Sequence, residues 1–302
     1  MKDRLRIVLV HKIVCLLFLL SGCTLLSPAF PPQEKIYSDL SDIELLQKIN
    51  GIEKAADTKE ELITLIQLHG LLVEKEINMA KNLSAIADYY ILLGASYATD
   101  PSEKQVLYMA AIAYAEKLMM LNEKFSNSVR NGIEPWDALE TLTANEVDGM
   151  GRWSTAALFY FRECIPNYRR IFSVKWVNRS KKMMDRIEQL NPEWMNGANY
   201  FNLAIYYHAL PEIAGGSRAM SAHYLSEAEK IGGNRSLFSW GKAKYIYTTY
   251  GNEALFDKSL NKILSASLDD DNAGDDRVDP YAWRVYFHRE ASQLLSKKDM
   301  FF

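Results

Sequence analysis

The chain contains 302 residues, of which 48% are hydrophobic and 24% are charged, as is ordinary for a globular protein. Its formal net charge of −3 provides no positive surplus, so a nucleic-acid-binding function is not expected. After the first thirty residues, no stretch is long and apolar enough to predict a membrane span. The length suits one large domain or an elongated array.

Residues 1–22 are organised like a secretory signal. A basic start is followed by an apolar run over residues 13–20, which is shorter than the roughly 20 residues needed to cross a bilayer. The segment "LSGC" at 20–23 resembles the bacterial lipobox, in which a diacylglyceryl group is attached to the cysteine and the signal is cut before it. We expect Cys23 to be lipidated and to anchor the mature chain to a membrane. The alternative is a signal cut elsewhere, with Cys23 free.

The residues after Cys23 predict a tether. The prolines of "SPAFPP" resist helix, so residues 23–35 are expected to be extended, and residues 36–302 to form a single all-helical domain. Cys15 would leave with the signal, so Cys164 would be the one remaining thiol. We therefore expect no internal disulfide and interpret Cys164 as an apolar core residue.

Apolar residues recur at helical spacing along the rest of the chain, and almost no alternating strand pattern is found. We predict helices over residues 42–54, 58–82, 84–98, 102–121, 134–148, 151–164, 170–190, 193–209, 217–231, 236–250, 252–267 and 279–297. Ser84, Ser102 and Ser217 are expected to be N-caps. The acidic segment "DDDNAGDDRVD" is expected to be a loop between the last two helices.

Short turns between these helices imply antiparallel neighbours, which favours a repeat architecture. The tetratricopeptide (TPR) pattern has a bulky residue, then Leu-Gly, then an aromatic residue in its first helix. Its spacing is kept by Tyr90, Leu93, Gly94 and Tyr97 and, more loosely, by Trp194, Gly197, Ala198 and Phe201. We predict an all-α, TPR-like helical hairpin array (an α-solenoid); the alternative is an irregular helical bundle.

Five segments occur in an order that resembles a known family. They are "GRWSTAALFYF", "NPEWMNGANYFNLAIYYHALPEIAGGS", "AHYLSEAEKIGGN", "WGKAKYIYTTYGNEALFDKSLNKIL" and a closing amphipathic helix. Together with the lipobox, residues 85–297 resemble the T-component (TatT) of TPR-associated tripartite ATP-independent periplasmic (TRAP) transporters. Ser217 departs from the acidic residue that often follows the Gly-Gly turn in that family.

The resemblance implies a periplasmic lipoprotein of TPR-like helices. It further implies homo-oligomers, typically trimers, that bind the periplasmic solute-binding subunit of the transporter, and a hydrophobic cavity or pore. Which membrane holds the anchor is not implied.

Patterns for catalysis and metal binding are weak. The segment "GGSRA" at 215–219 approaches a nucleophile elbow, but no strand precedes Ser217, which is better interpreted as an N-cap. Asp269, Asp271 and Gly274 approach an EF-hand loop, but Pro280 stands where a glutamate is required. The histidines of the mature chain are scattered and no CxxC occurs, so zinc is not supported. We expect no enzyme activity, catalytic residue, metal or cofactor.

Two sets of side chains are candidates for binding. The first is a basic stripe on one helix face, which we interpret as a partner surface, with a solvated face as the alternative: Lys175, Arg179, Lys182 and Arg186. The second is a set of aromatic residues that could line an apolar cavity, although most buried aromatic residues simply fill a core: Trp153, Phe159, Tyr200, Tyr207, Trp240 and Tyr247.

The expected function is a lipid-anchored periplasmic accessory protein of a TRAP-type transporter. It would bind the solute-binding subunit and accept or pass small apolar or amphipathic ligands through a cavity. The alternatives are a TPR-like lipoprotein that scaffolds envelope assembly and, with less support, a hydrolase of envelope polymers.

Overall fold

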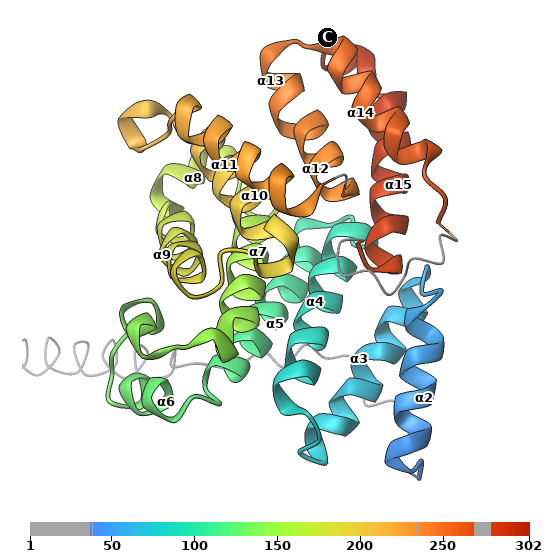
Figure 1. Cartoon of the computed structure of the whole chain (residues 1–302), viewed down its shortest axis with the longest axis vertical. Coiled ribbons are helices and arrows are strands. Elements are labelled where there is room, and N and C mark those ends of the chain that lie inside the picture. The colour runs from blue at the N-terminus through green and yellow to red at the C-terminus, as the bar shows by residue number, and fades with distance from the viewer. Residues whose placement is uncertain (1–36, 38, 234, 269–278) are drawn as a thin grey trace, which may run out of the picture. The chain divides into compact units, whose positions relative to one another are not determined.

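The computed structural model describes residues 37, 39–233, 235–268 and 279–302, and every regular element in these ranges is a helix (Figure 1). The predicted signal, Cys23 and the predicted tether lie outside the described residues. The acidic segment 269–278 does as well. Within the described ranges, no helix combines the length and apolar character that a membrane span requires.

The first half of the described chain runs from α2 to α7. Its elements are α2 (Asp42–Glu53), α3 (Lys59–Glu74), α4 (Met79–Ser96), α5 (Pro101–Met119), α6 (Glu123–Arg130), the 3-10 turns η1 (Pro135–Asp137), η2 (Leu139–Thr141) and η3 (Ala144–Glu146), and α7 (Val147–Glu163).

The second half begins with the short helix α8 (Asn167–Arg170) and the turn η4 (Ile171–Ser173). It continues with α9 (Lys175–Leu190), α10 (Trp194–Ala209), η5 (Glu212–Ala214), α11 (Arg218–Gly232), α12 (Ser236–Gly241), the π-helical segment η6 (Lys242–Tyr247), α13 (Thr248–Tyr250), α14 (Glu253–Ser265), α15 (Tyr281–Ser296) and η7 (Lys298–Met300).

Helices pack mainly against their neighbours in the chain. α3 packs against α4, α4 against α5, α5 against α7, α7 against α9, and α10 against α11, while α12, η6, α14 and α15 form a further group (Figure 1). Short links such as residues 97–100 between α4 and α5 make these neighbours antiparallel. The prediction of an all-α helical array is confirmed.

Two predicted boundaries near the start are wrong. The helix expected over 58–82 ends at Glu74, and the next begins at Met79, so Ser84 is a buried residue inside α4 and not an N-cap. Glu76 and Asn78 have left-handed φ values of 57° and 43° and turn the chain between the helices. The apolar spacing stays in phase across this turn because both helices face the same core, which concealed the break.

The region before α7 also differs from the prediction. Residues 135–146 form the three 3-10 turns, and α7 is continuous from Val147 through the expected break to Glu163. The short helix α6 was not predicted. Asp100, and not Ser102, caps α5, since its carboxylate accepts from the amides of both Ser102 and Glu103.

Aromatic rings from neighbouring helices pack directly against glycines inside helices. A Cβ added at Gly94 in α4 would lie only 2.5 Å from Cε1 of Tyr108 in α5. Added Cβ atoms at Gly151 and Gly241 would lie closer still to Trp194 and Phe201. These small residues therefore permit close helix contacts, and Gly94 is one of the residues that keep the TPR-like spacing.

Asp88 of α4 connects the two halves of the described chain. This buried carboxylate pairs with Arg152 of α7 at 2.6 Å and accepts from Trp283 Nε1 of α15 at 3.0 Å. A second buried pair joins Arg235 to Asp279, and Arg235 also donates to the carbonyl of Met195. That contact supports the first turn of α10, where Met195 has a left-handed φ of 45°.

Gly94→Ala should destabilise the protein by about 2 kcal/mol, because the new methyl group would displace the buried Tyr108 ring. Gly70→Ala is the matched control: Gly70 is also inside a helix, but nothing lies within 4 Å of its added Cβ. That control should be neutral or slightly stabilising, because alanine favours helix over glycine. Urea unfolding of both variants checks the difference, and equal effects would contradict the packing role of Gly94.

Candidate functional site

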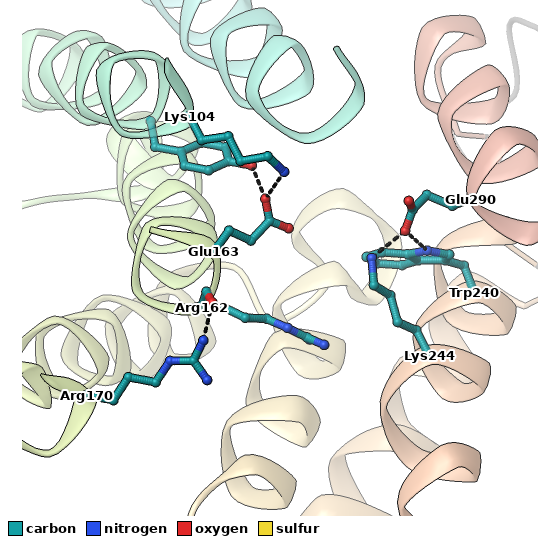
Figure 2. Close-up of polar contacts among 8 residues, drawn as sticks. Lys104, Arg162, Glu163, Arg170, Trp240, Lys244 and Glu290 are labelled. Atoms are coloured by element: carbon teal, nitrogen blue, oxygen red, sulfur yellow. Dashed lines mark hydrogen bonds and ion pairs between the residues drawn. The ribbon is translucent and has the colours of Figure 1, made fainter. Parts of the chain in front are cut away.

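Two partly buried ion pairs face each other across the interior of the array (Figure 2). On one side, Glu163 at the end of α7 accepts from Lys104 Nζ at 2.6 Å and from the Tyr108 hydroxyl at 2.7 Å, both in α5. The side chains of Lys104 and Glu163 are 17% and 18% exposed to solvent. Solvent therefore still reaches this pair, although it lies between helices.

The other side has the same chemistry. Glu290 of α15 pairs with Lys244 of the π-helical segment and accepts from Trp240 Nε1 at 3.3 Å. The side chains of Lys244 and Glu290 are 20% and 18% exposed to solvent. Each carboxylate is thus held by one ammonium group and one neutral donor, as a carboxylate withdrawn from water requires.

Arg162 lies beside these pairs. Its guanidinium carbon stands 3.7 Å from the centroid of the Tyr245 ring, so the cation reaches from α7 to the π-helical segment. Its backbone carbonyl accepts from Arg170 (Figure 2). Among the described residues, no carboxylate lies within ion-pair distance of the Arg162 side chain.

The π-helical segment shapes one wall of this site. Its six residues carry both Lys244 and Tyr245 toward the other groups. π-helical turns are rare and occur frequently at functional sites, because the extra residue per turn redirects side chains at a cost in helix stability. The irregular backbone here therefore coincides with the charged interior cluster.

Burial governs the ionisation of nearby hydroxyls and of the one described thiol. Desolvation raises the pKa values of Tyr108, Tyr245 and Tyr286 well above the usual range, and the Glu163 carboxylate raises that of Tyr108 further. Burial also raises the pKa of the Cys164 thiol to about 12, so it stays protonated at neutral pH. These groups are hydrogen-bond donors and apolar walls; none is an activated nucleophile.

The predicted aromatic residues belong to several separate groups of ring contacts. Phe159 and Trp240 lie near the two ion pairs, since Phe159 packs against Tyr108 and Trp240 bonds Glu290. Tyr247 belongs to the same π-helical segment as Lys244. The ligand-contact role of these residues stays a prediction.

The other predicted aromatic residues lie in separate clusters. Trp153 is buried, stacks on Trp176 at 5.9 Å and donates to Glu116. Tyr200 and Tyr207 both stack on Tyr224, between α10 and α11. Tyr207 also lines a hollow of about 260 Å³.

Three residues of the basic stripe contact the chain itself. Lys182 pairs with Asp137 at 2.6 Å, Arg186 pairs with Glu140 at 3.2 Å, and Arg179 stacks on Trp136 at 3.3 Å. These contacts hold the turns η1 and η2 against α9. Lys175 is exposed at the start of the helix. That the stripe binds a partner stays a prediction. Lys182, Arg186 and Arg179 also contact the turns η1 and η2 of the same chain.

Ser217 is the N-cap of α11, as predicted, because its hydroxyl accepts from the Met220 amide at 3.2 Å. In the described ranges, no three His, Cys, Asp or Glu side chains gather closely enough to hold a metal ion. The segment considered for calcium lies outside these ranges.

Sequence reasoning missed the charged members of the interior site: Lys104, Arg162, Glu163, Lys244 and Glu290. A signal was available, because Arg162 and Glu163 end an otherwise apolar helical stretch and Lys244 interrupts an aromatic run. Their partners, however, are 59 and 46 residues away in the chain, so no local pattern connects them.

The antiparallel helix pairs and the glycine–aromatic contacts define a helical-array protein of the TPR-like class. A model of the TRAP transporter T-component family matches residues 74–302, and the chain belongs to this family. The family suspected from the sequence is therefore confirmed. A search of curated proteins finds no match.

Membership makes the protein an accessory component of a TRAP transporter, associated with the cell envelope. The family is a transporter accessory family and not a known enzyme family. The match includes all helices from α4 to α15 and hence the whole interior site, whereas α2 and most of α3 precede it.

Lys104→Met should destabilise the protein by about 2 kcal/mol, because it leaves the Glu163 carboxylate partly buried with Tyr108 as its one remaining described donor. Lys182→Met removes the same charge from an exposed pair and should have a much smaller effect. Urea unfolding of both variants tests this, and addition of Glu163→Gln should recover part of the Lys104→Met loss. Equal losses in the two single variants would contradict the interior role of the pair.

Proposed function

We propose that the protein is a periplasmic, lipid-anchored accessory protein that binds the solute-binding subunit of a TRAP transporter. The observation that carries this proposal is the family match over residues 74–302, which extends across nearly all the described helices. The signal and lipobox pattern at residues 1–23 support the location, since they predict export and attachment at Cys23.

Two further parts of the proposal follow from the family resemblance. The protein forms homo-oligomers, with a trimer as the expected state, and it accepts a small apolar or amphipathic ligand in its interior. The Tyr245 ring supports the second part, because this half-buried ring provides apolar contact area beside the Arg162 guanidinium.

Binding of the solute-binding subunit is tested directly with purified proteins. The subunit encoded together with a TRAP membrane component is titrated against the immobilised protein, and we expect saturable binding with a Kd of about 10 µM or tighter. A solute-binding protein of an unrelated transporter is the negative control. Sedimentation of the protein alone gives the oligomer mass and tests the trimer separately.

Absence of a complex at tens of micromolar would overturn the docking proposal. Recovery of envelope assembly factors without any transporter subunit would favour the alternative scaffold function. Lys175→Glu tests the basic stripe, because Lys175 is exposed; weaker binding is expected if the stripe contacts the partner. Lys124→Glu, an exposed lysine of α6, is the matched control.

Cys23→Ser should release the protein from the membrane fraction without unfolding it, because the substitution removes the site of lipid attachment. Cell fractionation followed by immunoblotting measures the distribution, and circular dichroism measures the helix content. Cys164→Ser is the matched control and should stay in the membrane fraction. Retention of the Cys23→Ser protein in the membrane would show that the lipobox interpretation is wrong.

A further inference from the structure

Aromatic and basic side chains gather at the surface in the segment formed by α8 and η4. The side chains of Tyr168 and Phe172 are 73% and 83% exposed, and Arg169 between them is exposed as well. No aspartate or glutamate occurs in the sequence between Glu163 and Asp185, although lysines and arginines recur along this stretch. Single exposed apolar residues need no explanation, but a group of them marks an interaction site.

The backbone of this segment is held in place. Its helical turns place Tyr168 and Phe172, which are four positions apart, on the same face. The guanidinium of Arg170 donates to the backbone carbonyls of Arg162 and Ile165. These contacts tie α8 to the end of α7, so the exposed rings are presented by a fixed turn.

The size and charge of this surface favour a membrane over a protein partner. A stable protein interface involves roughly 20 residues on each side, far more than the apolar members of this segment. Aromatic rings beside cations suit the headgroup region of a bilayer, where the rings lie among the headgroups and the cations meet the phosphates of anionic lipids. A stretch without carboxylates also avoids repulsion from such a surface.

The predicted anchor would keep the domain close to a membrane. Tyr37, where the described chain begins, is fourteen residues after Cys23, and a chain of that length spans at most about 50 Å. Attachment over so short a distance raises the effective concentration of the domain at the bilayer, so a weak contact is sufficient.

We infer that Tyr168, Arg169 and Phe172 contact the surface of the membrane that holds the lipid anchor. The rings enter the headgroup region, and the arginine pairs with the phosphate of an anionic phospholipid. This inference goes beyond binding of the solute-binding subunit, and it rests on the lipid-anchoring part of the proposed function. A second attachment orients the domain on the bilayer, which a single tether cannot do.

A fluorescent label at residue 167 tests the contact. Asn167→Cys is combined with Cys164→Ser, and the lipidated mature protein is labelled with the environment-sensitive dye NBD. It is placed in vesicles of phosphatidylcholine with about one quarter phosphatidylglycerol. The emission should shift to shorter wavelength, and most of it should be lost when the lipid carries a doxyl quencher near its headgroup. The same label at Asn50→Cys, an exposed site of α2 on the other side of the domain, should not respond (Figure 1).

Variants of the rings make the result specific. Tyr168→Ser together with Phe172→Ser should abolish most of the lipid quenching at residue 167. Ile43→Ser together with Leu46→Ser removes two exposed apolar side chains of α2 and should leave the quenching unchanged. Thermal melting of each variant verifies that it is folded.

Variants of the charge test the lipid phosphate. Arg169→Gln should weaken the quenching at residue 167 in the anionic vesicles and leave it unchanged in vesicles of phosphatidylcholine alone. Lys124→Gln, at an exposed lysine of α6, should have no effect in either kind of vesicle.

The inference is overturned if the lipid quencher affects the label at residue 167 no more than the label at residue 50. It is also overturned if the label at residue 167 is shielded from aqueous iodide without any lipid quenching, because another copy of the chain would then cover the segment. Mass spectrometry of the purified protein reports the lipid on Cys23 separately. Lipid on Cys23 without quenching overturns this inference alone, whereas absence of the lipid overturns the anchoring proposal and this inference with it.

Discussion

The contact between an aromatic ring and the bare backbone of a helical glycine is the constraint on which much of this structure depends. Tyr108 lies against Gly94, Trp194 against Gly151 and Phe201 against Gly241, in each case where a methyl group would not fit. The contact at Gly94 brings α5 close to α4 and fixes the Tyr108 ring, whose hydroxyl then reaches Glu163. One packing contact therefore both spaces the array and orients a donor of the interior site.

Charged groups inside an apolar array must satisfy one another, and this requirement explains the form of the site. Glu163 and Glu290 come from different helices, yet each is held by a lysine and by the polar tip of an aromatic residue. The π-helical turn is part of this arrangement, because it carries Lys244 and also Tyr245, on which Arg162 stacks.

The basic stripe shows how a correct local inference can miss its structural context. The spacing places all four cations on one face of α9, as expected for residues three and four positions apart. A distant segment pairs with two of these cations, since Asp137 and Glu140 in the turns η1 and η2 contact Lys182 and Arg186. Helical periodicity describes a face of a helix, but it carries no information about the segment that packs there.

The sequence by itself determined the helical class, most element positions and the Ser217 cap, because helix periodicity and capping depend on residues a few positions apart. It also determined the family, through the order of its segments. The same periodicity gave a wrong helix boundary at residues 75–78, where two helices face one core and the apolar pattern continues through the turn between them. Only the tertiary structure decided that Lys104 meets Glu163, that Lys244 meets Glu290, and that Arg162 stands between them without a described carboxylate. Those contacts depend on how whole helices cross, and the crossing is set by the combined packing of many residues far apart in the chain.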